Sequence, residues 1–188
     1  MRRLLTSLAV IAAAVAIGAC GNKEEVILHG NTEGAYLDLG PLKYQVQISR
    51  LLNPASIEDR SYFVGVDPSQ RRLPAGQEWF AVFIRVENAG EKVGHPARAA
   101  DYVITDTQNT KFRPVAMSQD NVFAYRGGGT LAPEDILPAP DTPAGQGSIQ
   151  GAMLLYKIPT RNFENRPLEL SIRSSDAPGQ TATVDLDV

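Results

Sequence analysis

The chain has 188 residues, with 18 basic and 21 acidic side chains and a formal net charge of −3. This length suits one folded domain behind a leader, and the mildly acidic balance argues against nucleic acid as a partner. Because the chain has a single cysteine, an internal disulfide is excluded and the fold has to depend on a hydrophobic core.

The N-terminal segment has the pattern of a secretory signal peptide. Arg2 and Arg3 precede an uncharged apolar run over residues 4–17. The run has the length of a signal-peptide core, and it is shorter than the roughly 20 residues that a membrane-spanning helix needs. We therefore expect this segment to direct export rather than to remain as a transmembrane anchor.

The residues Ile17-Gly18-Ala19-Cys20 resemble the lipobox of bacterial lipoproteins, with an aliphatic residue and two small residues before a cysteine. The resemblance implies that residues 1–19 are a lipoprotein signal peptide and that Cys20 becomes the lipidated first residue, carrying palmitate or related acyl chains. Two or three acyl chains hold a protein on a membrane far more firmly than one. The alternative is ordinary cleavage after Gly18, which leaves Cys20 as a free thiol.

The segment after the cysteine is polar. Residues 20–40 are rich in Gly, Asn, Lys, Glu and Thr. One apolar patch, over residues 26–28, is alternatively interpreted as an edge strand of the domain. We expect a flexible tether here. The folded domain is expected over residues 41–188.

Two strands are expected early in this domain. Residues 42–49 alternate strictly, which predicts a half-buried strand; its core-facing residues would be Leu42, Tyr44, Val46 and Ile48. Residues 78–88 are apolar on both faces near Trp79, which predicts a central strand covered on both sides. Its core face would carry Phe80, Val82, Ile84 and Val86, and its opposite face Trp79, Ala81 and Phe83.

Further strands follow towards the C-terminus. Residues 102–105 and 111–115 predict a hairpin around a turn at 106–110. Residues 149–159, 168–173 and 182–188 predict three more strands, and short helical turns are expected at 56–62 and 119–125. About seven strands without a long helix favour an all-β fold, an immunoglobulin-like antiparallel β-sandwich. A closed barrel is the alternative.

Two connections, over residues 53–77 and 118–148, are too long for plain turns of a sandwich. Loops of this length are usually functional or disordered. Tyr and Arg are enriched at binding hot spots, so Tyr62, Tyr125 and Arg126 are the predicted binding residues. Phe63 and Phe123 could also belong to this binding surface, but it is at least as good an interpretation that they pack inward and hold the loops on the sandwich.

Three stretches of the chain carry a family resemblance: "WFAVFIRVENAGEKV", "DYVITDTQNTKFRPV" and "PAGQGSIQGAMLLYKIP". They resemble a family of bacterial lipoprotein domains of unknown function, which are immunoglobulin-like sandwiches related in fold to a secreted mycobacterial immunoprotective antigen. The resemblance implies fold and location, and it brings no catalytic residues.

The sequence therefore predicts a cell-envelope lipoprotein on the extracytoplasmic side of a bacterial cell membrane or outer envelope. We expect it to be a non-catalytic binding module for an envelope protein or a small-molecule ligand, attached to the membrane by its lipid and without a cofactor. A copper carrier is an alternative, with His29, His95, Met117 and Met153 as soft-metal ligands. A hydrolase with its site on the long loops is a further alternative, although no nucleophile and base have a recognisable spacing.

Overall fold

The structure is a computed structural model, and it describes residues 25–188 except 91–92, 97–98 and 128. The elements are β1 (His29–Gly30), β2 (Tyr36–Leu39), β3 (Leu42–Leu52), η1 (Arg60–Phe63), α1 (Pro68–Arg71), β4 (Gln77–Asn88), β5 (His95–Pro96), β6 (Ala99–Thr105), β7 (Lys111–Phe112), β8 (Thr130–Leu131), β9 (Ile136–Leu137), α2 (Pro143–Gln146), β10 (Ala152–Pro159), η2 (Thr160–Glu164), β11 (Leu168–Ser174) and β12 (Ala182–Leu186).

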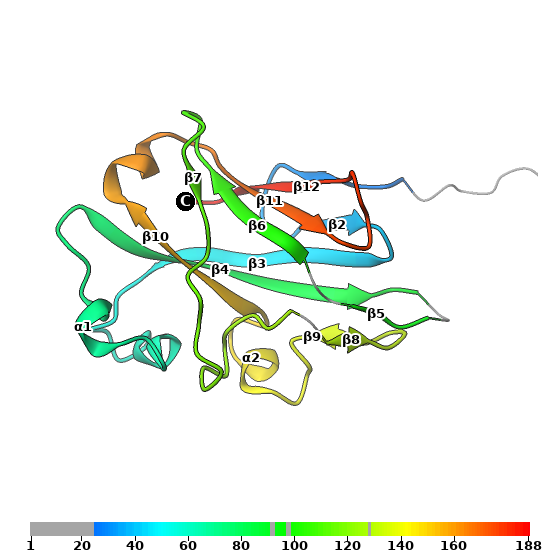
Figure 1. Ribbon diagram of the computed structural model, residues 1–188, viewed down its shortest axis with the longest axis horizontal. Helices are drawn as coiled ribbons and strands as arrows, with labels where there is room; N and C mark the ends of the chain where they lie inside the picture. Colours follow the sequence, from blue (N-terminus) through cyan, green and yellow to red (C-terminus); the bar gives the residue numbers. More distant parts are fainter. Residues whose placement is uncertain (1–24, 91–92, 97–98, 128) are drawn as a thin grey trace, which may run out of the picture.

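Two sheets face each other in a β-sandwich (Figure 1). The first sheet has the strand order β1-β12-β11-β6-β7, and the second has the order β10-β4-β3-β2, with β9 also paired to β4. Strands β5 and β8 form a small separate pair. Among the described strands, only β1 and β12 pair in parallel. The predicted all-β sandwich is confirmed, and seven of these strands have four or more residues.

The core between the sheets is built by the alternation expected from the sequence. Phe80, Val82, Ile84 and Val86 of β4 are completely buried, and they pack with Leu168, Leu170 and Ile172 of β11 and with Ala182 and Val184 of β12. Strand β4 is central because β3 and β10 pair with it on either side. The facing predicted for β4 is thus confirmed, and β11 and β12 alternate between buried and partly exposed residues in the same way.

The facing predicted for the end of β3 is wrong. Leu42, Tyr44 and Val46 point into the core as expected, but the register against β4 shifts between Val46 and Ile48. A bulge of one extra residue reverses the faces of everything that follows. Ile48 is consequently 36% exposed, whereas Ser49, expected on the polar face, is only 5% exposed.

The tether predicted over residues 20–40 extends too far into the domain. Residues 36–39 form β2, which pairs with β3 and buries Leu37 and Leu39 completely. Just before it, the Thr183 backbone N–H of β12 donates to the carbonyl oxygen of Leu28, and β1 continues that pairing. Two core leucines outweigh the loop-like composition around them, so the sandwich already begins near Leu28.

The hairpin around residues 106–110 is present, but its return strand is shorter than predicted. Strand β7 ends at Phe112. Three residues later the Val115 backbone N–H donates to the carbonyl oxygen of Leu155, which belongs to β10 of the other sheet. The chain therefore leaves the first sheet after β7 and crosses the open side of the sandwich to the edge of β10.

Candidate functional site

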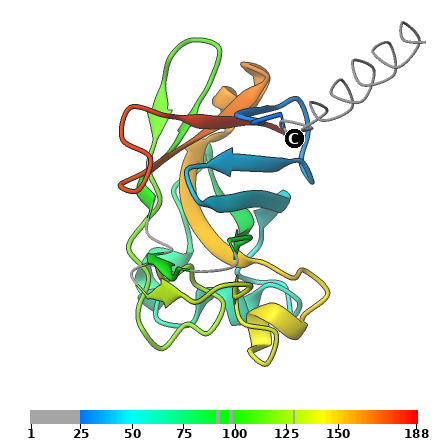
Figure 2. The same ribbon diagram turned by 90° about the vertical axis from the view of Figure 1, so that its right-hand side faces the viewer.

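Both long connections cover the outer face of the second sheet. The first loop is defined as residues 53–76, between β3 and β4, and the second loop as residues 113–151, between β7 and β10. Figure 2 shows both on the same side of the sandwich, with α2 (yellow) as part of the second loop. The second apolar face of β4 explains this layer, because Trp79, Ala81 and Phe83 pack there against Phe63 of the first loop.

A buried asparagine joins the two loops. Asn121 is completely buried, and its Nδ2 donates to the carbonyl oxygens of Tyr62 at 2.7 Å and Val64 at 3.0 Å. Its Oδ1 accepts from the Phe123 backbone N–H at 3.0 Å. One side chain therefore fixes the second loop on the backbone of the first.

Tyr62, one of the predicted binding residues, lies between the loops. Its ring packs edge-on against Phe83 and Phe123, with centroid distances of 5.2 and 4.9 Å. The Arg50 guanidinium carbon lies 5.8 Å from the Tyr62 ring centroid. These contacts give Tyr62 a packing role at the loop junction, and it does not line the groove described next.

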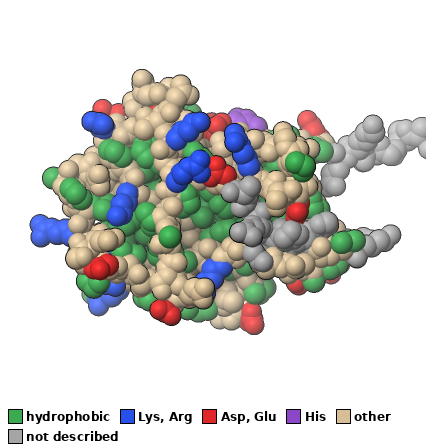
Figure 3. Space-filling view, viewed as in Figure 1, with side chains coloured by type: hydrophobic (Ala, Val, Ile, Leu, Met, Phe, Trp, Pro, Cys, Tyr) green, Lys and Arg blue, Asp and Glu red, His purple; other side chains and the backbone are tan. Residues whose placement is uncertain are grey.

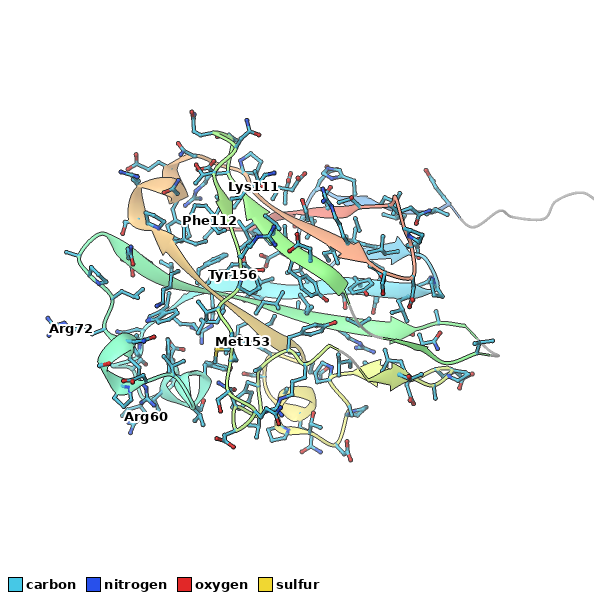
Figure 4. The ribbon with its side chains drawn as sticks, in the orientation of Figure 1. Arg60, Arg72, Lys111, Phe112, Met153 and Tyr156 are labelled. Carbon is cyan, nitrogen blue, oxygen red and sulfur yellow. The ribbon has the colours of Figure 1, made fainter. Side chains whose placement is uncertain are left out.

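Tyr125 and Arg126, the other two predicted binding residues, line a groove at the open edge of the sandwich. We call it the edge groove; its walls are residues 114–119 and 124–127, and its floor is Tyr102 of β6 and residues 153–155 of β10. Its volume is about 610 Å³. Figure 4 shows Met153 and Tyr156 along β10, away from Arg60 and Arg72 of the first loop. The edge groove therefore uses both sheets and the second loop.

Two tyrosines meet in the edge groove. The Tyr125 and Tyr102 rings are in edge-to-face contact, with centroids 5.2 Å apart. The buried Tyr102 hydroxyl makes no hydrogen bond of normal geometry to a described residue, although Tyr125 lies close enough to influence its titration. Burial, and then the neighbouring tyrosines, raise the pKa of Tyr102 well above its usual value. Tyr102 is thus a neutral hydrogen-bonding group at physiological pH.

Arg126 stands at the rim of the edge groove. It is exposed, and its Nη2 donates to the backbone carbonyl oxygen of Asn121 at 3.0 Å. Since Asn121 is fixed by the loop junction, the guanidinium is held near the groove, and among the described residues its other N–H donors have no hydrogen-bond partner. The sequence could suggest Tyr125 and Arg126 by residue type, but nothing local predicted that Tyr102 lies beside them.

The potential soft-metal ligands are only partly brought together. Met117 and Met153 both line the edge groove. His29 lies on β1, where Nδ1 and Nε2 are 2.7 Å from the Thr183 hydroxyl and 2.9 Å from Asn31 Oδ1. The His95 side chain lies outside the described part of the chain. Among the described residues, no group of three His, Cys, Asp or Glu side chains is placed to hold a metal ion.

Two other surface features lie apart from the edge groove. A cavity of about 780 Å³ lies between the first loop and the ends of β3 and β4, with Arg71, Arg72 and Trp79 in its wall. On the outer face of the first sheet, Lys111 and Arg173 gather around the ion pair of Arg113 with Asp101. Figure 3 shows Lys and Arg side chains in this area, over β6 and β7.

The predicted lipidation site, Cys20, lies outside the described residues. In the part of the chain that the structure describes, no helix is long and apolar enough to cross a membrane. The question of membrane attachment therefore depends on the lipobox pattern of residues 17–20.

Comparisons with known proteins gave matches only among solved structures. No protein-family model matches the chain, and no curated protein matches it. Among solved structures, it is similar to the yjhA protein of Bacillus subtilis, with 15% identity, 84% of this chain and 99% of that chain covered, and a TM-score of 0.46. It is also similar to ycdA of Bacillus subtilis, a protein proposed to be a lipoprotein. The identity is 12%, the match covers 81% of this chain and 38% of the ycdA chain, and the TM-score is 0.47.

Proposed function

We propose that this protein is a bacterial envelope lipoprotein, anchored through Cys20 on the extracytoplasmic side, whose sandwich is a non-catalytic binding module. The observation that carries the binding role is the edge groove, where Tyr125 and Arg126 meet Tyr102 on an apolar floor. A concave apolar site with a few convergent polar groups is the usual form of a small-ligand site. The resemblance of three sequence stretches to immunoglobulin-like lipoprotein domains supports the location in this proposal and not the binding role.

The anchor is tested by replacing the only thiol. Cys20→Ser removes the nucleophile that would take the lipid, so labelling with an alkynyl fatty acid should be lost and the chain should leave the membrane fraction or stay unprocessed. The wild-type protein should label and partition into detergent. If the serine variant still labels with fatty acid, lipidation at Cys20 is wrong.

The binding role is tested with a matched pair of double variants. Tyr125→Ala with Arg126→Ala removes the polar rim of the edge groove, whereas Tyr36→Ala with Arg60→Ala removes the same residue types from exposed positions outside it. Envelope extract is passed over each immobilised protein, and the retained proteins and small molecules are identified by mass spectrometry. We expect the groove variant alone to lose what the wild type retains. Identical recovery by both variants, with unchanged melting, would place binding elsewhere.

A further inference from the structure

We infer that the ligand of the edge groove is an anionic amphiphile, with a carboxylate or phosphate group at Arg126 and an apolar body along the floor. This inference depends on the proposed function, because it names the ligand class of the same groove.

The lining of the edge groove carries one sign of charge. Arg126 is the only charged side chain among its described lining residues, and no carboxylate lines it. The nearest acid in the sequence, Asp120, lies outside the lining and accepts from the Ser118 hydroxyl at 3.2 Å. A lone cation beside an apolar surface attracts an anion and leaves a ligand cation without a partner.

Arg126 is suited to hold anionic oxygens. Its guanidinium has five N–H donors, and the hydrogen bond to the Asn121 carbonyl oxygen uses one of them. That bond also orients the side chain, because Asn121 is completely buried and bonded to the first loop. Carboxylates and phosphates match such a fork with two parallel hydrogen bonds.

The floor of the edge groove is suited to an apolar body. Met117 and Val115 line it as half-buried side chains, and Tyr102, Met153, Leu154 and Leu155 lie beneath them with 6% or less of their surface exposed. Methionine is unbranched and polarizable, so it adapts to apolar ligands of different shape. The volume of about 610 Å³ lies within the range of small-molecule sites.

A second hollow with apolar residues in its wall shares Arg126 with the edge groove. It has a volume of about 390 Å³, and Val122, Leu137 and Ala144 are in its wall. Arg126 is again the only charged residue in the described lining. Arg126 therefore borders two hollows with apolar residues in their walls, and an anionic head with apolar groups attached could use both.

The inference is tested with four probes that have straight alkyl chains of seven or eight carbons and different head groups. Octanoate, octyl phosphate, octan-1-ol and octylamine are titrated by calorimetry into the full chain held in phosphatidylcholine nanodiscs, with empty nanodiscs as the blank. We expect the two anions to bind more tightly than the alcohol, and the amine to bind most weakly. The ratio between octanoate and octyl phosphate distinguishes a carboxylate ligand from a phosphate ligand.

Two variants and one control locate the effect. Arg126→Gln should weaken octanoate binding about tenfold or more, because a charge-assisted hydrogen bond is lost. Ala116→Glu puts a carboxylate in the groove wall and should reverse the preference towards octylamine. Arg60→Gln removes an exposed arginine of the first loop and should leave binding within about twofold of wild type, since distant exposed charges are screened.

Three results would overturn the inference. They are octylamine binding as tightly as octanoate, Arg126→Gln binding octanoate unchanged, and no binding of any probe. None of these results would by itself remove the proposed function, because the extract experiment with the two double variants tests binding without assuming a ligand class.

Discussion

Single polar side chains fix the turns and loops of this sandwich. Asn88 is completely buried, and its Nδ2 lies 2.9–3.1 Å from the carbonyl oxygens of Val93, Leu131 and Ala132. Asn121 does the same between the two long loops. Each side chain satisfies several backbone carbonyl groups that would otherwise be buried without partners. Replacing either asparagine should therefore lower the stability of the fold more than the loss of one small side chain implies.

Asp106 gives the clearest case at this scale. Its carboxylate is buried in the hairpin turn between β6 and β7 and accepts from Asn162 and Asn165 and from the backbone N–H groups of Gln108 and Thr110. Burial alone would raise the pKa of Asp106, but these hydrogen bonds outweigh it and lower the pKa from 3.8 to about 2. The ionised form is therefore stabilised by folding.

We predict that Asp106→Asn lowers the free energy of unfolding by about 1–3 kcal/mol at neutral pH, because the amide cannot accept all four bonds. Since the folded pKa lies below the unfolded one, the contribution is present above pH 3.8 and is lost as the pH falls towards 2. Urea unfolding at several pH values measures this. Gln108→Ala, which keeps the backbone donor, is the control. A cost for Asp106→Asn that does not change between pH 5 and 2 would contradict the account.

At the scale of elements, the period-two pattern predicted most strands and their faces. It worked where burial is continuous, as in β4, β11 and β12. It failed at Ile48, because a bulge changes the phase without a signal in the residue types. It also missed β2, because Leu37 and Leu39 give only one short alternation, and pairing with β3 buries them.

The bulge in β3 predicts a difference between two isoleucines. Ile84→Asp should cost about 4 kcal/mol or more and prevent folding, because it buries a charge without a partner in the core. Ile48→Asp should cost within about 1 kcal/mol, since that side chain is partly exposed. Circular dichroism melting compares the two variants. Equal loss of folding would mean that Ile48 points into the core and that the bulge is misplaced.

The first and second loops lie very close together at Gly65. Its φ is +79°, and a Cβ there would lie 2.2 Å from Cβ of Ser118 in the second loop. Gly76 has a similar φ of +82° with nothing within 4 Å, so it is the matched control. Gly76→Ala should cost about 1 kcal/mol through backbone strain alone. Gly65→Ala should cost about 1–3 kcal/mol more, because the loops are forced apart.

Urea unfolding followed by the fluorescence of Trp79, the only tryptophan, measures both alanine variants. Adding Ser118→Gly to Gly65→Ala should recover part of the loss, since it removes the colliding Cβ. Equal costs at Gly65 and Gly76, or no recovery in the double variant, would mean that the loops do not touch there.

At the scale of the whole molecule, the two loops form a third layer over one face of the sandwich and leave the edge groove beside it. Residue type alone selected Tyr125 and Arg126, and the structure puts both in this groove. Residue type could not select Tyr102, Met117 or Met153, because these three residues come together only through contacts between distant parts of the chain. Tyr62 was selected by the same rule and lies in the loop junction instead.

The central claim, that ligand binds in the edge groove, has a direct spectroscopic test. The chain has three methionines; Met117 and Met153 line the edge groove, and Met1 lies outside the described residues. With ¹³C-methyl methionine in the full chain, octanoate should shift both groove methyl signals with one saturation curve, and Arg126→Gln should require about tenfold more octanoate for the same shift. Saturable binding in calorimetry without a shift of either signal would contradict the claim.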